Sequence, residues 1–166
     1  DKNTRLYIAD IYMKTADYKK AVDEYDTILQ KTSADKKDVK KMQEIAQALS
    51  DFSDSNYAGA LPVLEQYVKD YPELYLYIGT CYASMDDSEH MFENYEKYIK
   101  KYGYMSHANY VKQKKNNYLY YLIGITSYAL FVNPNDDKMR EYLDVFKSEL
   151  FRYKNGNLAI NTNPHP

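Results

Sequence analysis

The side chains that could perform chemistry in this chain are few and scattered. The thiol and imidazole groups belong to Cys81, His90, His107 and His165. None of the histidines has a cysteine or a second histidine at the spacing of a metal site. A catalytic cysteine needs a neighbouring base or cation to form its thiolate, and no histidine lies near Cys81 in the sequence. We therefore interpret Cys81 as a packing residue and Glu89–His90 as polar residues at a helix start.

The acidic pairs Asp86-Asp87 and Asp136-Asp137 stand where turns are expected between paired helices. Carboxylates there can cap the next helix and complement its dipole, so we interpret them as capping residues. The basic stretch VKQKKNN at residues 111–117 is interpreted as a solvated linker, with contact to an acidic partner as the alternative. No glycine-rich phosphate loop occurs in the sequence. The sequence therefore predicts no enzyme activity, no metal and no cofactor.

The composition is that of one folded domain with a sizeable core. The 166 residues are 45% hydrophobic and 28% charged, with a formal net charge of −2. This charge gives no general attraction to nucleic acid or to an anionic membrane, and no apolar run approaches the roughly 20 residues of a membrane-spanning helix. Tyrosines alternate with lysines in NYEKYIKKYGY, which could form a nucleic-acid platform, but their helical spacing turns them inward. We predict neither nucleic-acid binding nor direct membrane insertion.

The compartment stays open at this point. The chain begins with Asp1 rather than Met, so we expect a fragment or a processed form of a longer protein. A single cysteine excludes an intramolecular disulfide, which fits a reducing compartment without requiring one. A cytoplasmic location is favoured over a periplasmic or secreted one, both of which remain compatible with the sequence.

Apolar residues recur at i, i+3, i+4 and i+7 along most of the chain, which is the pattern of amphipathic helices. Five glycines and five prolines are few for an all-β chain, which needs many turns. Residues 104–117 are expected to form an inserted loop or a short helix, and residues 154–166 an irregular tail. We predict eight helices, over approximately residues 6–14, 18–30, 42–52, 57–70, 73–85, 88–102, 118–131 and 137–153.

The same sequence motif recurs in several of these helices. The stretch ADYKKAVDEYDTIL, which begins at Ala16, returns as SNYAGALPVLEQYV from Ser55 and more loosely as DSEHMFENYEKYI from Asp87. Helix pairs that recur about every 30–40 residues indicate a helical repeat, because each unit must present the same packing surface to the next. We predict a repeat domain over residues 1–153, with units at approximately 2–35, 41–72, 73–103 and 117–153. The alternative is an irregular helical bundle.

The repeated residues resemble the signature of the tetratricopeptide repeat (TPR), W-x2-L-G-x2-Y followed by A-x3-F and P. The first unit matches at Ile8, Ala9, Tyr12, Ala21, Tyr25 and Ile28. The third unit matches at Tyr75, Ile78, Gly79, Tyr82, Met91, Tyr95 and Tyr98. The second unit matches at Ala60, Leu64, Tyr67 and Pro72, with a turn one residue shorter, and the fourth is looser.

Small residues at the crossing of paired helices allow their backbones to approach closely. We expect this role for Ala9, Ala21, Ala60, Gly79 and Gly124. Bulky tyrosines on the facing helices would then fill the space beside them.

The resemblance implies an all-α, right-handed superhelical solenoid of antiparallel helix pairs. It also implies a concave groove, lined by the first helix of each unit, that binds a peptide or helix of a partner protein. The implied groove residues are Leu6, Asp10, Met13, Lys14, Ala46, Ser50, Ser53, Leu76, Thr80, Ala83, Tyr121, Ile125 and Tyr128. Relatives that clamp the carboxylate tails of heat-shock chaperones carry Lys and Asn where this chain has Leu6 and Asp10, so that activity is not implied.

The sequence thus predicts a protein-interaction scaffold, with a structural spacer or oligomerisation domain as the alternative; a homo-oligomer stays open. Tyr121, Ile125 and Tyr128 are expected to form an aromatic patch that receives a partner segment, because aromatic anchors dominate interface energetics. The competing interpretation is that the C-terminal tail, through Leu158 and Ile160, folds back and covers this patch.

Overall fold

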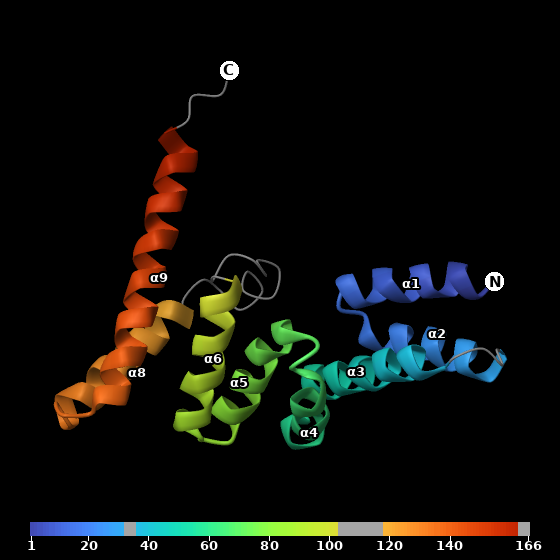
Figure 1. Ribbon diagram of the computed structural model, residues 1–166, viewed down its shortest axis with the longest axis horizontal. Helices are drawn as coiled ribbons and strands as arrows, with labels where there is room; N and C mark the ends of the chain where they lie inside the picture. The colour runs from blue at the N-terminus through green and yellow to red at the C-terminus, as the bar shows by residue number, and fades with distance from the viewer. Residues whose placement is uncertain (32–35, 103–117, 163–166) are drawn as a thin grey trace. The chain divides into compact units, whose positions relative to one another are not determined.

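The computed structural model describes residues 1–31, 36–102 and 118–162, and side chains within residues 1–31, 36–98, 100–101 and 122–151. In these ranges all regular secondary structure is helical and no strand is present, so the predicted all-α class is confirmed for the described residues (Figure 1). The chain divides into two compact units, Asp1–Asp87 and Ser88–Pro166. This division falls between the two helices of the third predicted repeat.

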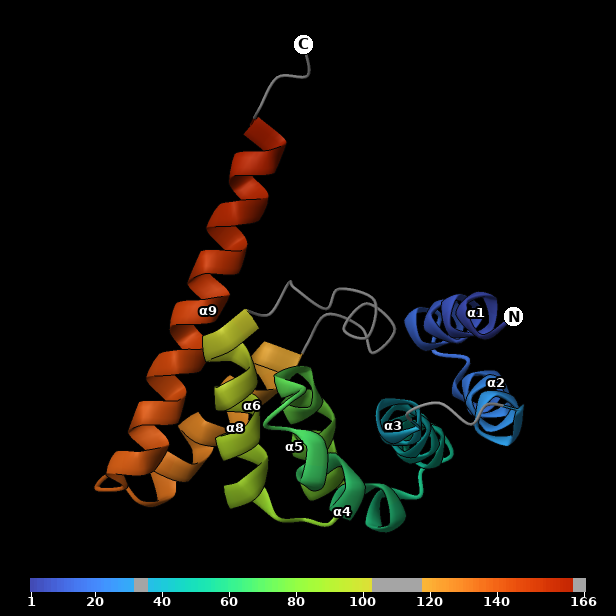
Figure 2. The same ribbon diagram turned by 45° about the vertical axis from the view of Figure 1, so that its right-hand side comes forward.

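Within the described residues, the first unit contains α1 (Lys2–Lys14), α2 (Tyr18–Lys31), α3 (Lys37–Ser53), α4 (Tyr57–Tyr67), the short 3-10 helix η1 (Pro72–Leu74) and α5 (Tyr75–Ser84). The second unit contains α6 (Ser88–Tyr102), α8 (Tyr118–Val132) and α9 (Asp137–Thr162). In the first unit each α-helix packs against the next one in sequence. In the second unit α9 packs against both α8 and α6 (Figure 2).

Two helices begin earlier than the periodic pattern predicts. The first, α1, begins at Lys2, because the Asp1 carboxylate caps it by accepting a hydrogen bond, 3.1 Å long, from the main-chain N–H two residues later. The third, α3, begins at Lys37, because Val39 is buried three residues before Met42. Both side chains belong to the same packed cluster, so the apolar face of α3 continues for one more turn.

The last helix is longer than predicted. It continues to Thr162, so the prediction of an irregular tail from residue 154 is wrong as far as that residue. A glycine such as Gly156 costs about 1 kcal/mol in a helix interior, which neighbouring helix formers such as Leu158 can offset, and the next proline is Pro164. The predicted loop at residues 104–117 lies outside the described residues.

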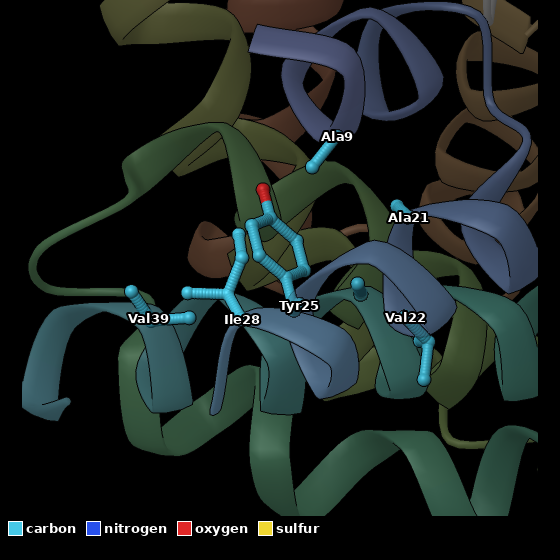
Figure 3. Close-up of a cluster of buried hydrophobic side chains, with 7 residues drawn as sticks. Ala9, Ala21, Val22, Tyr25, Ile28 and Val39 are labelled. Atoms are coloured by element: carbon cyan, nitrogen blue, oxygen red, sulfur yellow. The ribbon is translucent and has the colours of Figure 1, made fainter. Parts of the chain in front are cut away.

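The core of the first unit is a cluster of small and large side chains from α1, α2 and α3. Ala9, Ala21 and Ala46 have no exposed surface, and Tyr25 and Ile28 fill the space beside them (Figure 3). Val22 and Val39 complete the cluster. Alanines at the contacts let helix axes approach closely, while the larger side chains keep the packing dense. Ala9 and Ala21 are thus fully buried in this cluster, as the predicted close-approach role requires.

The first three helix pairs are joined by the same turn. Each turn holds one non-glycine residue in the left-handed region, with φ of 60° at Ala16, 64° at Ser55 and 57° at Asp86. In each, the next residue donates its N–H to the carbonyl five positions earlier: Asp17 to Tyr12 (2.9 Å), Asn56 to Asp51 (2.8 Å) and Asp87 to Tyr82 (3.0 Å). This is a Schellman-type helix end. The second unit's turn is therefore not shorter than the others, contrary to the sequence-based prediction.

The fourth pair is joined differently. Asn133 donates its N–H to the carbonyl of Ala129 at 2.8 Å, and the Asp136 carboxylate caps α9 by accepting a hydrogen bond from the Met139 N–H at 3.0 Å. The capping role predicted from the sequence is thus confirmed for Asp136. This different turn agrees with the looser sequence match of the fourth unit.

Replacing Ala16 by glycine is expected to stabilise the protein by about 0.5–1 kcal/mol. A residue with a side chain costs about 1–2 kcal/mol in the left-handed region. Glycine removes this cost, but part of the gain is offset because glycine loses more conformational entropy on folding. Urea unfolding followed by circular dichroism measures the change. Ala58→Gly, in the first turn of α4, is the control and should lower stability. A loss of stability in Ala16→Gly would contradict the turn described here.

Replacing Ala9 by leucine is expected to destabilise the protein by about 1–3 kcal/mol, because a larger side chain at this fully buried contact forces α1 away from α2. Tyr7→Leu, on the exposed side of the same helix, should change stability by less than about 0.5 kcal/mol. The midpoints of chemical denaturation compare the two variants. Equal effects would show that Ala9 is not at a close helix crossing.

Candidate functional site

The predicted groove residues of α1 divide into two kinds. Leu6 and Met13 are half-buried and pack against the core cluster of the first unit. Asp10 and Lys14 are exposed and form an ion pair of 2.8 Å on the helix surface. An exposed i, i+4 pair of this kind contributes about 0.3–0.5 kcal/mol, so both side chains stay available to solvent and to a partner.

The predicted residues on α3 and α5 are largely covered. Ser50 and Thr80 are buried, and the Thr80 hydroxyl donates to the carbonyl of Leu76 at 3.0 Å. Ala46, also on α3, lies in the core cluster. These side chains offer no surface to a partner in this structure. Ser53 is exposed, and Leu76 and Ala83 are half-buried, so the contribution of α5 to a docking surface is small.

The clearest unpartnered surface lies on α8. The glycine and the large apolar side chains that are exposed on one side of this helix are Gly124, Tyr128, Phe131 and Val132, here called the α8 stripe, and the exposed Ser127 lies on the same side. Tyr128 is 69% exposed, Phe131 83% and Val132 66%. Their spacing of i, i+4, i+7 and i+8 places them on one face of a helix. The stripe includes one predicted site residue, Tyr128.

The other two predicted residues on this helix differ from Tyr128. Ile125 is half-buried. The side chains of Tyr121, Leu158 and Ile160 are not among those that the structure describes. Sequence reasoning missed Phe131 and Val132. The signal was present, since they follow Tyr128 by three and four residues and therefore share its face.

The opposite side of α8 is buried. Leu122 and Thr126 have almost no exposed surface, and the Thr126 hydroxyl is satisfied by donating to the carbonyl of Leu122 at 2.7 Å. All fifteen residues of α8 lack a charged side chain. A helix that is apolar on all sides is normally buried on all sides, whereas this one is covered on one side and open on the other.

The prediction for Gly124 is not met within its own unit. This glycine was predicted to allow close approach of a neighbouring helix, but it is exposed, and a methyl group built there would meet no described atom within 4 Å. Nothing in the described packing of its own unit therefore requires a glycine. Ala60 and Gly79, predicted for the same role, are both buried.

The α6–α9 contact holds the second unit together. Phe92 of α6 lies 5.5 Å from Tyr142 and 6.1 Å from Phe146 of α9, measured between ring centroids. An ion pair between Lys138 and Glu89, 3.1 Å long, lies at the edge of this contact. These aromatic side chains are buried, so the contact fixes α9, against which α8 packs.

Several tyrosine hydroxyls form hydrogen bonds between helices. The Tyr67 hydroxyl donates to the Glu44 carboxylate, which raises the pKa of the tyrosine. The Tyr18 hydroxyl lies 3.4 Å from that of Tyr77, and burial raises the pKa of Tyr18. Both phenols are thus protonated near neutral pH, as hydrogen-bonded structural groups should be.

The described residues contain no metal-binding cluster of three or more His, Cys, Asp or Glu side chains. Cys81 has no exposed surface, and burial raises the pKa of its thiol to about 12. Because the thiolate is the reactive form, Cys81 is suited to packing rather than to nucleophilic attack. Among the described helices, none is both long and apolar enough to cross a membrane.

Comparisons with known proteins gave no match: no family model, no curated protein and no solved structure is similar to this chain.

The Cys81 thiol is expected to react with a disulfide reagent such as DTNB at least about 100-fold more slowly in the native protein than in urea at pH 8. A thiol with a pKa raised to about 12 holds far less than a per cent of thiolate at that pH, and burial also blocks access. The rate of thionitrobenzoate release measures this. A fast native reaction would contradict the assignment to the core.

Proposed function

We propose that this chain is a protein-interaction module, built as a right-handed solenoid of TPR-like helix pairs, that binds a peptide or helix of a partner protein. The repeat architecture is supported by the turn that the first three pairs share, with left-handed residues at Ala16, Ser55 and Asp86. The recurrence of one helix end at regular positions along the chain is what a repeat array requires.

The binding role is carried by one observation, the exposed α8 stripe. Apolar side chains scattered singly on a surface need no explanation, but contiguous aromatic patches mark interaction sites. Tyr128 and Phe131 stand side by side on one helix face, and aromatic residues are the usual anchors of interfaces. The predicted groove positions Asp10 and Lys14 belong to the other compact unit, so the proposal places docking on the α8 stripe alone.

A non-enzymatic role agrees with the chemistry of the described residues. The one cysteine is buried with a raised pKa, and the hydroxyls of Tyr18 and Tyr67 make hydrogen bonds between helices. An oligomerisation domain is the second candidate function. It is favoured by the absence of charge along α8, a property that suits an identical partner as well as a foreign one.

A library of amphipathic helical peptides, selected against the protein, tests the proposal. Selected peptides should carry uncharged apolar residues at i, i+3 or i+4, and i+7 spacing. Their affinity, measured by fluorescence anisotropy, should fall at least about tenfold in Phe131→Asp, because loss of one aromatic anchor costs about 2 kcal/mol or more.

The matched control is Tyr7→Asp, which places the same charge at a tyrosine that is similarly exposed, at 68%, on α1. It should leave peptide affinity unchanged. Peptides that respond to Tyr7→Asp and ignore Phe131→Asp would place binding elsewhere and overturn the proposal. Failure to select any peptide that depends on Phe131 would do the same.

A further inference from the structure

We infer that the helix that docks on the α8 stripe is α8 of a second copy of this chain, related to the first by a two-fold axis. The inference rests on the proposed function of the stripe as a docking surface, and it names the occupant. Three observations carry it: the charge of the helix, the position of its glycine and the area that the stripe offers.

Charge restricts the partner first. No residue of α8 is charged, so a charged side chain laid on the stripe would lose its hydration and gain no counter-charge. The partner must therefore bring an uncharged, apolar helix face. Among the described helices only α5 and α8 lack charged residues, and the central residues of α5, Ile78–Cys81, are already buried. The chain itself thus supplies one exposed face of the required kind, which is α8.

Gly124 adds the second observation. A glycine inside a helix is less favourable than alanine, and its own unit gives it no described neighbour that would justify the cost. It lies on the stripe, one turn before Tyr128. A glycine at that place lets a second helix backbone come close, with the aromatic side chains packing on either side of the crossing. In a two-fold contact both glycines meet at the same crossing, so each copy gains the same fit.

The area of the stripe fits a weak but specific dimer. Full burial of one aromatic side chain removes about 150–250 Å² of its surface from water. Tyr128, Phe131 and Val132 are already about a sixth to a third buried in the single copy, so with both copies contributing the contact buries roughly 800 Å², the size of a weak, transient interface. Interfaces of this size are typical of reversible complexes, so we expect a dissociation constant of roughly 1–100 µM.

Sedimentation equilibrium of the 166-residue chain, from about 1 to 200 µM, tests the inference. We expect a monomer–dimer equilibrium that Phe131→Asp weakens at least tenfold. Gly124→Leu should weaken it as strongly, because leucine separates the crossing helices. In dilute solution Gly124→Leu should not lower the Tm, since leucine favours a helix and meets no described atom of its own chain. Tyr7→Asp should leave the dimer constant unchanged.

A second measurement locates the axis. Gly124→Cys should form a covalent dimer on mild oxidation, because the two copies of position 124 meet at the crossing, whereas the exposed control Asp144→Cys should not. A protein that stays monomeric up to about 200 µM, or a dimer that ignores both Gly124→Leu and Phe131→Asp, overturns the inference. If the monomeric protein still binds peptides in a way that depends on Phe131, the proposed function survives and only the second copy is wrong. If the protein neither dimerises nor binds peptides in a way that depends on Phe131, both the inference and the proposed function are wrong.

Discussion

Within each compact unit the described helices bury apolar side chains against neighbouring helices, and the rest of the structure depends on this packing. Isolated helices shorter than about 12–15 residues are marginal in water, and α4 and α5, with 11 and 10 residues, fall below that length. They persist because α4 packs on α3 and on α5. The alanines of the first core make this packing possible, since a bulkier residue at Ala9 or Ala21 would hold the helices apart.

The turns determine which faces of consecutive helices pack together. A left-handed residue with a Schellman-type bond reverses the chain within a few residues and sets the exit direction of the next helix. The chain uses this turn three times without glycine, placing Ala16, Ser55 and Asp86 in a region that L-residues avoid. At Ala16 and Ser55 the strain is tolerated because the flanking helices, α1 with α2 and α3 with α4, pack against each other and hold the turn in place. The fourth pair, joined through Asn133 and Pro134, lacks this constraint.

Most of the helices could be predicted from the sequence, because periodicity and breakers are local signals. The burial of Ala9 and Ala21 followed from the repeated small residues, and the packing role of Cys81 from the lack of a neighbouring base in the sequence. Helix ends were less predictable: the extra turn of α3 depends on Val39 finding a place in a core built by α1 and α2, and α9 continues through Gly156. The identical turn at Ser55 was missed, because left-handed geometry leaves a clear sequence signal only when glycine occupies it.

The candidate site was less predictable than the fold for a related reason. Periodicity shows that α8 is apolar all round, but it does not show which side its own unit covers. The structure covers the side of Leu122 and Thr126 and leaves Tyr128 and Phe131 open. The same ambiguity misplaced Gly124, whose small size fits a close helix contact that its own unit does not make.

An exposed aromatic stripe is costly for a chain that gains nothing from it. Burying apolar surface is worth about 25 cal/mol per Å², so two open aromatic side chains and a valine forgo several kcal/mol that a partner surface would recover. An open apolar face also invites non-specific association, which charged residues normally suppress. On α8 no charged residue performs that function, and a glycine stands at the start of the open face where alanine would make a more stable helix. Both features oppose the stability and solubility of a single copy, and both become favourable once a second helix lies on the stripe.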